Sequence, residues 1–146
     1  MSEALYTTDI LRLAASIPHH TRLVGPQGTA EKRSPVCGSR VTVDVDLDAE
    51  GRVGAVGLLV RACALGQASA SLLAADVLGK TPDELAAARD ALDAWLSGEG
   101  DLPAWSGLAA LSRAQGYPAR HASIRLAFEA AAEAAAMART KVMAGG

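Results

Sequence analysis

Apolar and polar residues alternate strictly between positions 41 and 47. The apolar members of this run are Val41, Val43, Val45 and Leu47, and the polar members are Thr42, Asp44 and Asp46. A period of two predicts a β-strand with one buried face and one solvated face. After a turn at 48–52, residues 53–60 predict the returning strand of a hairpin, although Gly54 and Gly57 weaken that pattern. The polar run 29–33 predicts a modest strand at the edge of the sheet.

The apolar spacing outside the hairpin is helical. Thr81-Pro82-Asp83-Glu84 is a capping box with proline at the first helical position, so it predicts a helix that runs to about Leu96. Further helices are predicted at 10–16 behind the capping pair Thr8-Asp9, at 64–78, at 103–111, and from 122 or 123 to about 141. This order predicts an α+β fold, in which a small antiparallel sheet of two or three strands has helices packed on one face. No repeat or linker divides the chain, so a single domain over 1–146 is expected.

Composition narrows the class of protein. Half of the 146 residues are apolar, and the net charge of −2 argues against nucleic acid as the main partner. The first residues lack a basic start followed by an apolar block, so no secretory signal is predicted. The most apolar span, 53–79, is interrupted by Arg61, Gln67 and Asp76, which argues against a membrane helix. These features predict a soluble, cytoplasmic protein.

Two cysteines flank the predicted hairpin. Cys37 precedes its first strand and Cys63 follows its second. In an antiparallel hairpin, the entry of the first strand lies beside the exit of the second. Pairing about a turn near Gly51 brings residue 41 opposite 59–61. Cys37 and Cys63 are therefore predicted to be neighbours in space.

A neighbouring cysteine pair has three interpretations. A disulfide is disfavoured by the reducing conditions of the cytosol. Two buried structural thiols are a common arrangement for free cysteines. A metal site is the third interpretation, because Gly38 allows a tight turn in the loop 35–39, and because helix-terminus amides and Arg61 stabilise a thiolate at Cys63. The residues alone leave the last two interpretations open.

A metal site usually has at least three protein ligands, so the histidines are the next candidates. His121 stands where the last helix begins. His19 and His20 follow the end of a predicted helix, where a solvated pair is the usual arrangement. A single histidine is more often a surface residue than a ligand, and spacing alone does not decide the role of His121.

Three stretches of the chain resemble a known family. SPVCGSRVTVDVDLDAEGRV resembles the first cysteine region of the U-type iron–sulfur cluster scaffolds, the IscU/SufU/NifU N-terminal family, in which proline shortly precedes Cys-Gly-Asp. ACALGQASASLLAADVLGKTPDEL resembles the family's second segment, and RHASIRLAFEAAAEAA resembles the third. The resemblance runs from about Ser34 to Ala136, and three ordered motifs at family spacing make it specific.

The resemblance also shows what this chain lacks. Cys37 and Cys63 match the first two family cysteines, and His121 matches the histidine before the third. Ser39 stands in place of the family's aspartate and Ala122 in place of its third cysteine. The resemblance thus implies a metal set of Cys37, Cys63 and His121, with Ser39 and Ala122 as weak or vestigial positions. Two thiolates and an imidazole suit iron or zinc.

The function that the resemblance implies is that of an iron–sulfur cluster assembly scaffold or carrier, which binds iron or a cluster. Its implied partners are a cysteine desulfurase and cluster-accepting proteins. The alternative is a zinc-binding adaptor of the same fold that serves sulfur transfer without assembling clusters, and a metal-free form of the fold with buried thiols is the third hypothesis. No nucleophile–base pair, phosphate loop or paired carboxylates are recognisable, so no enzymatic activity is expected.

Overall fold

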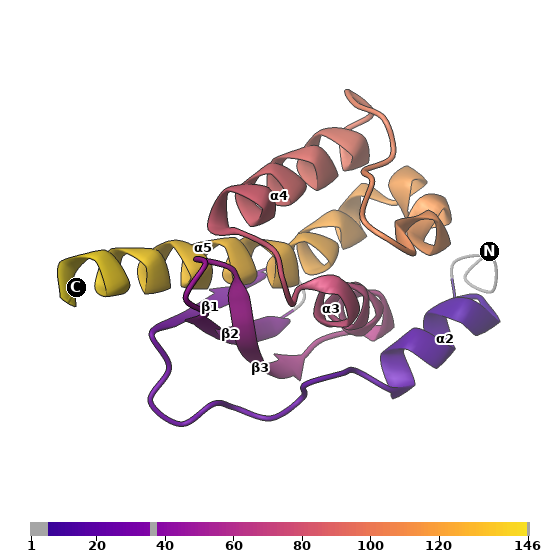
Figure 1. Ribbon diagram of the computed structural model, residues 1–146. Coiled ribbons are helices and arrows are strands. Elements are labelled where there is room, and N and C mark those ends of the chain that lie inside the picture. The colour runs from indigo at the N-terminus through magenta and orange to yellow at the C-terminus, as the bar shows by residue number, and fades with distance from the viewer. Residues whose placement is uncertain (1–5, 36–37, 146) are drawn as a thin grey trace.

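The computed structural model describes residues 6–35 and 38–145 (Figure 1). Strands β1 (Gly28–Arg33), β2 (Arg40–Leu47) and β3 (Val53–Arg61) form an antiparallel sheet in that order. Val41 pairs with Val60, so the predicted hairpin register is confirmed. The predicted edge strand is confirmed as well, because β1 pairs with β2 from Gly28 opposite Val45 to Arg33 opposite Arg40.

The helices largely follow the predicted ranges. They are α2 (Thr8–Ala15), α3 (Ala64–Asp76), α4 (Pro82–Leu96) and α5 (His121–Gly145), with the 3₁₀ helices η1 (Leu108–Gly116) and η2 (Pro118–Arg120). The predicted capping box of α4 is confirmed, since the Thr81 hydroxyl accepts from the Glu84 N–H at 3.1 Å and the Glu84 carboxylate accepts from the Thr81 N–H at 2.9 Å. Within the described ranges, no helix is long and apolar enough to cross a membrane.

Two helix predictions need correction. The cap of α2 is Thr7, whose hydroxyl accepts from the Ile10 N–H at 3.3 Å, so this helix starts at Thr8, two residues before the predicted start at Ile10. The helix predicted at 103–111 begins only at Leu108 and is a 3₁₀ helix. The residues before Leu108 in the predicted range are not helical. Instead, the Trp105 indole N–H donates to the Leu72 carbonyl at 2.8 Å, and Gly107 turns the chain at a φ of 86°.

The helices pack on one face of the sheet, as predicted. Helix α5 lies across β1 and β2, while α3 and α4 pack against α5, and α2 packs against α3 (Figure 1). The sheet contributes Val41, Val43 and Val45, which are all 0% exposed. Small side chains allow α5 to approach closely: a Cβ at Gly28 would collide with the Ala134 carbonyl oxygen and lie 2.8 Å from the Ala138 nitrogen. The buried alanines of α5 are residues 127, 130, 131, 132, 134, 135 and 138.

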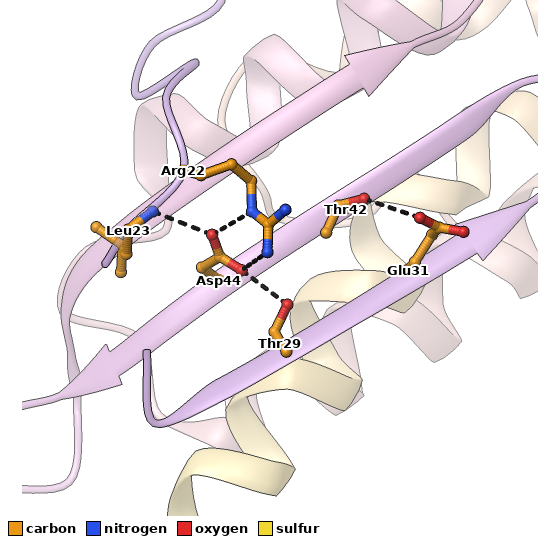
Figure 2. A network of polar contacts seen from close by, with 6 residues as sticks. All are labelled: Arg22, Leu23, Thr29, Glu31, Thr42 and Asp44. Atoms are coloured by element: carbon orange, nitrogen blue, oxygen red, sulfur yellow. Dashed lines mark hydrogen bonds and ion pairs between the residues drawn. The ribbon is translucent and has the colours of Figure 1, made fainter. Parts of the chain in front are cut away.

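The other face of the sheet differs from the prediction. The polar residues of β2 were expected to face solvent, yet Asp44 is 0% exposed and Thr42 is 6% exposed. The segment between α2 and β1 crosses this face, and it comes so close to Gly57 that a Cβ there would lie 2.8 Å from the Leu23 nitrogen. Figure 2 shows the result, with Asp44 enclosed beneath Arg22 and Leu23. A period of two identifies the two faces of a strand, but it does not show which loop covers the polar one.

Asp44 anchors the crossing segment. It accepts hydrogen bonds from Arg22 Nε at 2.6 Å, from the Leu23 N–H at 3.0 Å and from the Thr29 hydroxyl at 2.7 Å (Figure 2). Burial pushes the pKa of Asp44 upward, but these hydrogen bonds and the charge of Arg22 outweigh burial, and the pKa lies below its ordinary value. With a second hydrogen bond from Arg22 Nη2 at 3.1 Å, Asp44 is a buried carboxylate that holds its charge through four donor groups from three residues.

His19 and His20 lie along the free edge of β3. Both residues are exposed, as expected of a solvated pair. They also accept hydrogen bonds from two backbone N–H groups of β3. The His19 carbonyl accepts from the Leu58 N–H at 2.9 Å, and His20 Nε2 accepts from the Val60 N–H at 3.2 Å. This pair therefore protects part of a sheet edge that would otherwise present unpaired donors.

Candidate functional site

The loop between β1 and β2 is closed by backbone hydrogen bonds at its two ends. The Ser34 N–H donates to the Ser39 carbonyl at 2.9 Å, and the Gly38 N–H donates to the Ser34 carbonyl at 3.0 Å. Gly38 has a φ of 72°, a conformation that favours glycine. Cys37 lies outside the described residues, so its predicted proximity to Cys63 stays a prediction. The register behind that prediction is confirmed, since Arg40 pairs with Arg61.

Cys63 is the N-cap residue of α3. It has extended backbone angles, and its side chain makes no capping hydrogen bond. The thiol is free and partly exposed. A negative charge is favoured at this end of a helix, where backbone N–H groups point outward. Cys63 therefore offers a sulfur that neither a disulfide nor a helix cap uses.

Ser123, in the first turn of α5, joins the segments that carry the three sequence motifs. Its hydroxyl lies 3.2 Å from the Ser39 hydroxyl, and both residues are buried. A Cβ at Gly66 would lie 3.3 Å from the Ser123 carbonyl oxygen, so the first turns of α3 and α5 are in close contact. The end of the β1–β2 loop, the start of α3 and the start of α5 thus converge.

The two weak candidate positions, Ser39 and Ala122, both lie next to Ser123. Ser39 is 3% exposed, and its hydroxyl is already partnered by that of Ser123. Ala122 immediately precedes Ser123 and is half-buried. Ser123 was not predicted from the sequence, and the signal that could have indicated it is its position directly after Ala122, a predicted vestigial position.

His121 is held by η1. Its Nε2 lies 3.0 Å from the Gln115 carbonyl oxygen and 3.2 Å from the Ala114 carbonyl oxygen. Because both partners can only accept, Nε2 carries a proton, and Nδ1 is the ring nitrogen left to coordinate a metal. Histidines that bind metals commonly donate their other ring N–H to such a carbonyl. No local signal in the sequence indicates that η1 orients this ring.

The described residues do not by themselves complete a metal site. Among residues 6–35 and 38–145, no group of three or more histidine, cysteine, aspartate and glutamate side chains is close enough to hold a metal ion. Of the predicted ligands, Cys63 and His121 lie in the described part of the chain, and their role as ligands stays a prediction. This sulfur and nitrogen chemistry fits iron or zinc, but at least one further ligand is needed.

No protein-family model matches the chain, and no curated protein does. Among solved structures, it is similar to the N-terminal part of a nitrogen-fixing NifU-like protein from Brucella abortus. The identity is 37%, the match covers 93% of this chain and 95% of that one, and the TM-score is 0.87.

Two further structures share the fold. One is named as an iron–sulfur cluster assembly scaffold protein for the SUF system of Fervidobacterium islandicum, with 20% identity over 92% of this chain and 99% of that one, at a TM-score of 0.82. The other is a hypothetical protein with 23% identity, 91% and 98% coverage and a TM-score of 0.73.

Proposed function

The chain belongs to the U-type scaffold family, with the NifU-like N-terminal domains, and on that basis we propose that it is an iron–sulfur cluster assembly scaffold or carrier. The observation that carries this proposal is the convergence at Ser123. There the hydroxyl contact to Ser39 joins the β1–β2 loop to α5, and the contact with Gly66 joins the start of α3 to α5. Each of these segments carries one of the family motifs.

We propose that iron or the cluster is held by Cys37, Cys63 and His121, with Nδ1 as the coordinating nitrogen of the imidazole. The hydrogen bonds from Nε2 to the carbonyl oxygens of Ala114 and Gln115 support this choice of atom. Ser39 and Ala122 add neither a thiolate nor a carboxylate to the set, so both are vestigial positions.

Three protein donors leave a coordination position for water or for a ligand from another molecule. An open position favours exchange of the bound cargo over permanent structural binding. The absent third thiol also removes a nucleophile that could accept persulfide sulfur. The chain is therefore proposed to carry or complete a cluster together with partner proteins. These partners are a cysteine desulfurase and cluster-accepting proteins. The proposed location is the cytoplasm, where thiols stay reduced.

The alternative is a zinc-binding adaptor in sulfur transfer. The alanine at position 122 favours it, because two thiolates and one imidazole are sufficient protein ligands for zinc, whereas a cluster needs an additional outside ligand. Both functions use the same residues but differ in the metal.

Anaerobic purification followed by reconstitution with ferrous iron and sulfide tests the proposal. We expect the protein to retain iron and acid-labile sulfide and to show a visible charge-transfer absorption band. Stoichiometric zinc without sulfide, which also resists replacement by iron, would instead establish the adaptor. Retention of neither metal would contradict both functions.

Restoring the missing thiol tests the placement of the third motif. Ala122→Cys adds a small side chain beside Ser123, so we expect more iron and sulfide per chain after reconstitution and slower loss of the cluster to a chelator. Ala119→Cys is the matched control, because it adds a thiol to an exposed residue of η2 only three positions earlier. Equal cluster content in the two variants would show that residue 122 does not face the site.

A further inference from the structure

Three arginines form a row across the end of the sheet. Arg33 pairs with Arg40 across β1 and β2, and Arg40 pairs with Arg61 across β2 and β3. Residues directly opposite each other in antiparallel strands project from the same face. Neighbouring strands lie about 4.8 Å apart, so the backbone positions of the row span about 10 Å. Like charges placed opposite each other in this way cost stability, and a row of three therefore needs a compensating partner.

The fold supplies only part of that compensation. Glu31 lies on the same face of the sheet as the three arginines. Its carboxylate accepts from Arg33 Nε at 2.7 Å and lies 4.0 Å from Arg40 Nε. It also accepts a hydrogen bond from the Thr42 hydroxyl (Figure 2). The hydrogen bond from Arg33 keeps the pKa of Glu31 below its ordinary value, so this carboxylate is charged at neutral pH. Arg61 is exposed and has no ion-pair partner in the part of the chain that the structure describes. One negative charge therefore faces three positive ones.

The row borders a pocket of about 420 Å³. The described residues that line it are Arg33, Ser34, Pro35, Gly38, Ser39, Arg40 and Arg61. Ser34 is 2% exposed, and among the described residues its hydroxyl has no hydrogen-bond partner. Buried hydroxyls normally have a partner, so a pocket wall with an unpaired hydroxyl and excess positive charge is suited to an oxygen-bearing anion.

We propose that Arg33, Arg40 and Arg61 dock an acidic segment of the partner protein that exchanges sulfur or cluster with this chain. This inference rests on the proposed function. Arginine binds carboxylates through two parallel N–H donors, and a row of about 10 Å matches several carboxylates along a peptide better than a single small anion. The Arg33 side chain is 66% exposed, so its guanidinium is accessible to a macromolecule. Because Arg61 precedes Cys63 by two residues, docking here brings a partner to the segment that carries the thiol.

Binding of a hexaglutamate peptide to the metal-free protein at low ionic strength, measured by calorimetry, tests the site. We expect each of Arg33→Gln, Arg40→Gln and Arg61→Gln to weaken binding by about two- to five-fold, and the triple variant by at least about tenfold. Arg12→Gln removes the same charge from a side chain of α2 that is 72% exposed, and it should bind like the wild type. Added salt should weaken the wild-type interaction more steeply than that of the triple variant.

Two outcomes would overturn the docking site. One is an equal loss of binding in Arg12→Gln and in the row variants, which would indicate a response to net charge alone. The other is inorganic phosphate displacing the peptide at equal concentration, which would indicate a site for one small oxyanion. Cys63→Ser should bind the peptide like the wild type, so a failure of cluster assembly and a failure of docking are distinguished in separate measurements.

Discussion

Replacing Cys63 with serine is expected to remove most of the iron that the chain retains after anaerobic reconstitution, without unfolding the protein. The thiol is partly exposed and caps no backbone N–H, so its removal takes little from the core. Serine is a preferred N-cap residue, and its hydroxyl can accept from the first turn of α3, so stability should stay equal or rise by up to about 1 kcal/mol. Iron and sulfide per chain, measured beside the thermal unfolding midpoint, separate loss of the ligand from loss of the fold.

Met143→Ser is the control for this change. Met143 also carries sulfur, but it is 75% exposed near the end of α5, and its loss should leave the iron content unaltered. His121→Ala should give a smaller loss of iron than Cys63→Ser, because a thiolate contributes charge as well as a donor atom. Wild-type iron content in Cys63→Ser would refute the proposed ligand set.

The largest effect on stability is expected at Asp44. Asp44→Asn keeps the size of the side chain but removes the charge, and it places an amide N–H among the donors of Arg22, Leu23 and Thr29. We expect the free energy of unfolding to fall by about 2–3 kcal/mol at neutral pH, which is less than for a fully enclosed ion pair because the Arg22 side chain is 48% exposed. Chemical denaturation of both proteins measures the difference.

The pH dependence of this effect follows from the lowered pKa of Asp44. Its pKa in the folded protein lies below the ordinary value of 3.8. At a pH between the folded and the unfolded pKa, Asp44 is protonated more often in the unfolded chain than in the folded protein. The stabilisation is therefore fully present above pH 3.8 and disappears as the pH falls through the folded-state pKa. The gap in stability between wild type and Asp44→Asn should therefore narrow in acid.

Asp9→Asn provides the matched comparison. Asp9 also pairs with an arginine, at 3.5 Å from Arg12, but its side chain is 71% exposed. Its replacement should change the free energy of unfolding by less than about 1 kcal/mol. If Asp44→Asn were no more destabilising than Asp9→Asn, Asp44 would not anchor the crossing segment.

The candidate site could be read from the sequence only in part. The sequence motifs predicted a site made of Cys37, Cys63 and His121, with Ser39 and Ala122 as weak positions. The structure brings the segments that carry the three motifs together at Ser123. The orientation of His121 could not be predicted, because it depends on carbonyl groups at the end of η1. The local apolar spacing predicted a helix at 103–111, whereas the segment is a 3₁₀ helix that begins only at Leu108, after Gly107 at a φ of 86°.

By itself, the sequence determined the elements whose signals are local. A strand of period two, a turn at Gly51 and a returning apolar strand specify the pairing of Val41 with Val60, because a shift by one residue would turn every valine of β2 away from the core. The capping box likewise determined where α4 begins. Only the tertiary structure decided what covers the polar face of β2, since the segment over Gly57 and the donors around Asp44 come from distant parts of the chain. The energy of a buried carboxylate depends on those distant donors, and an alternating pattern carries no information about them.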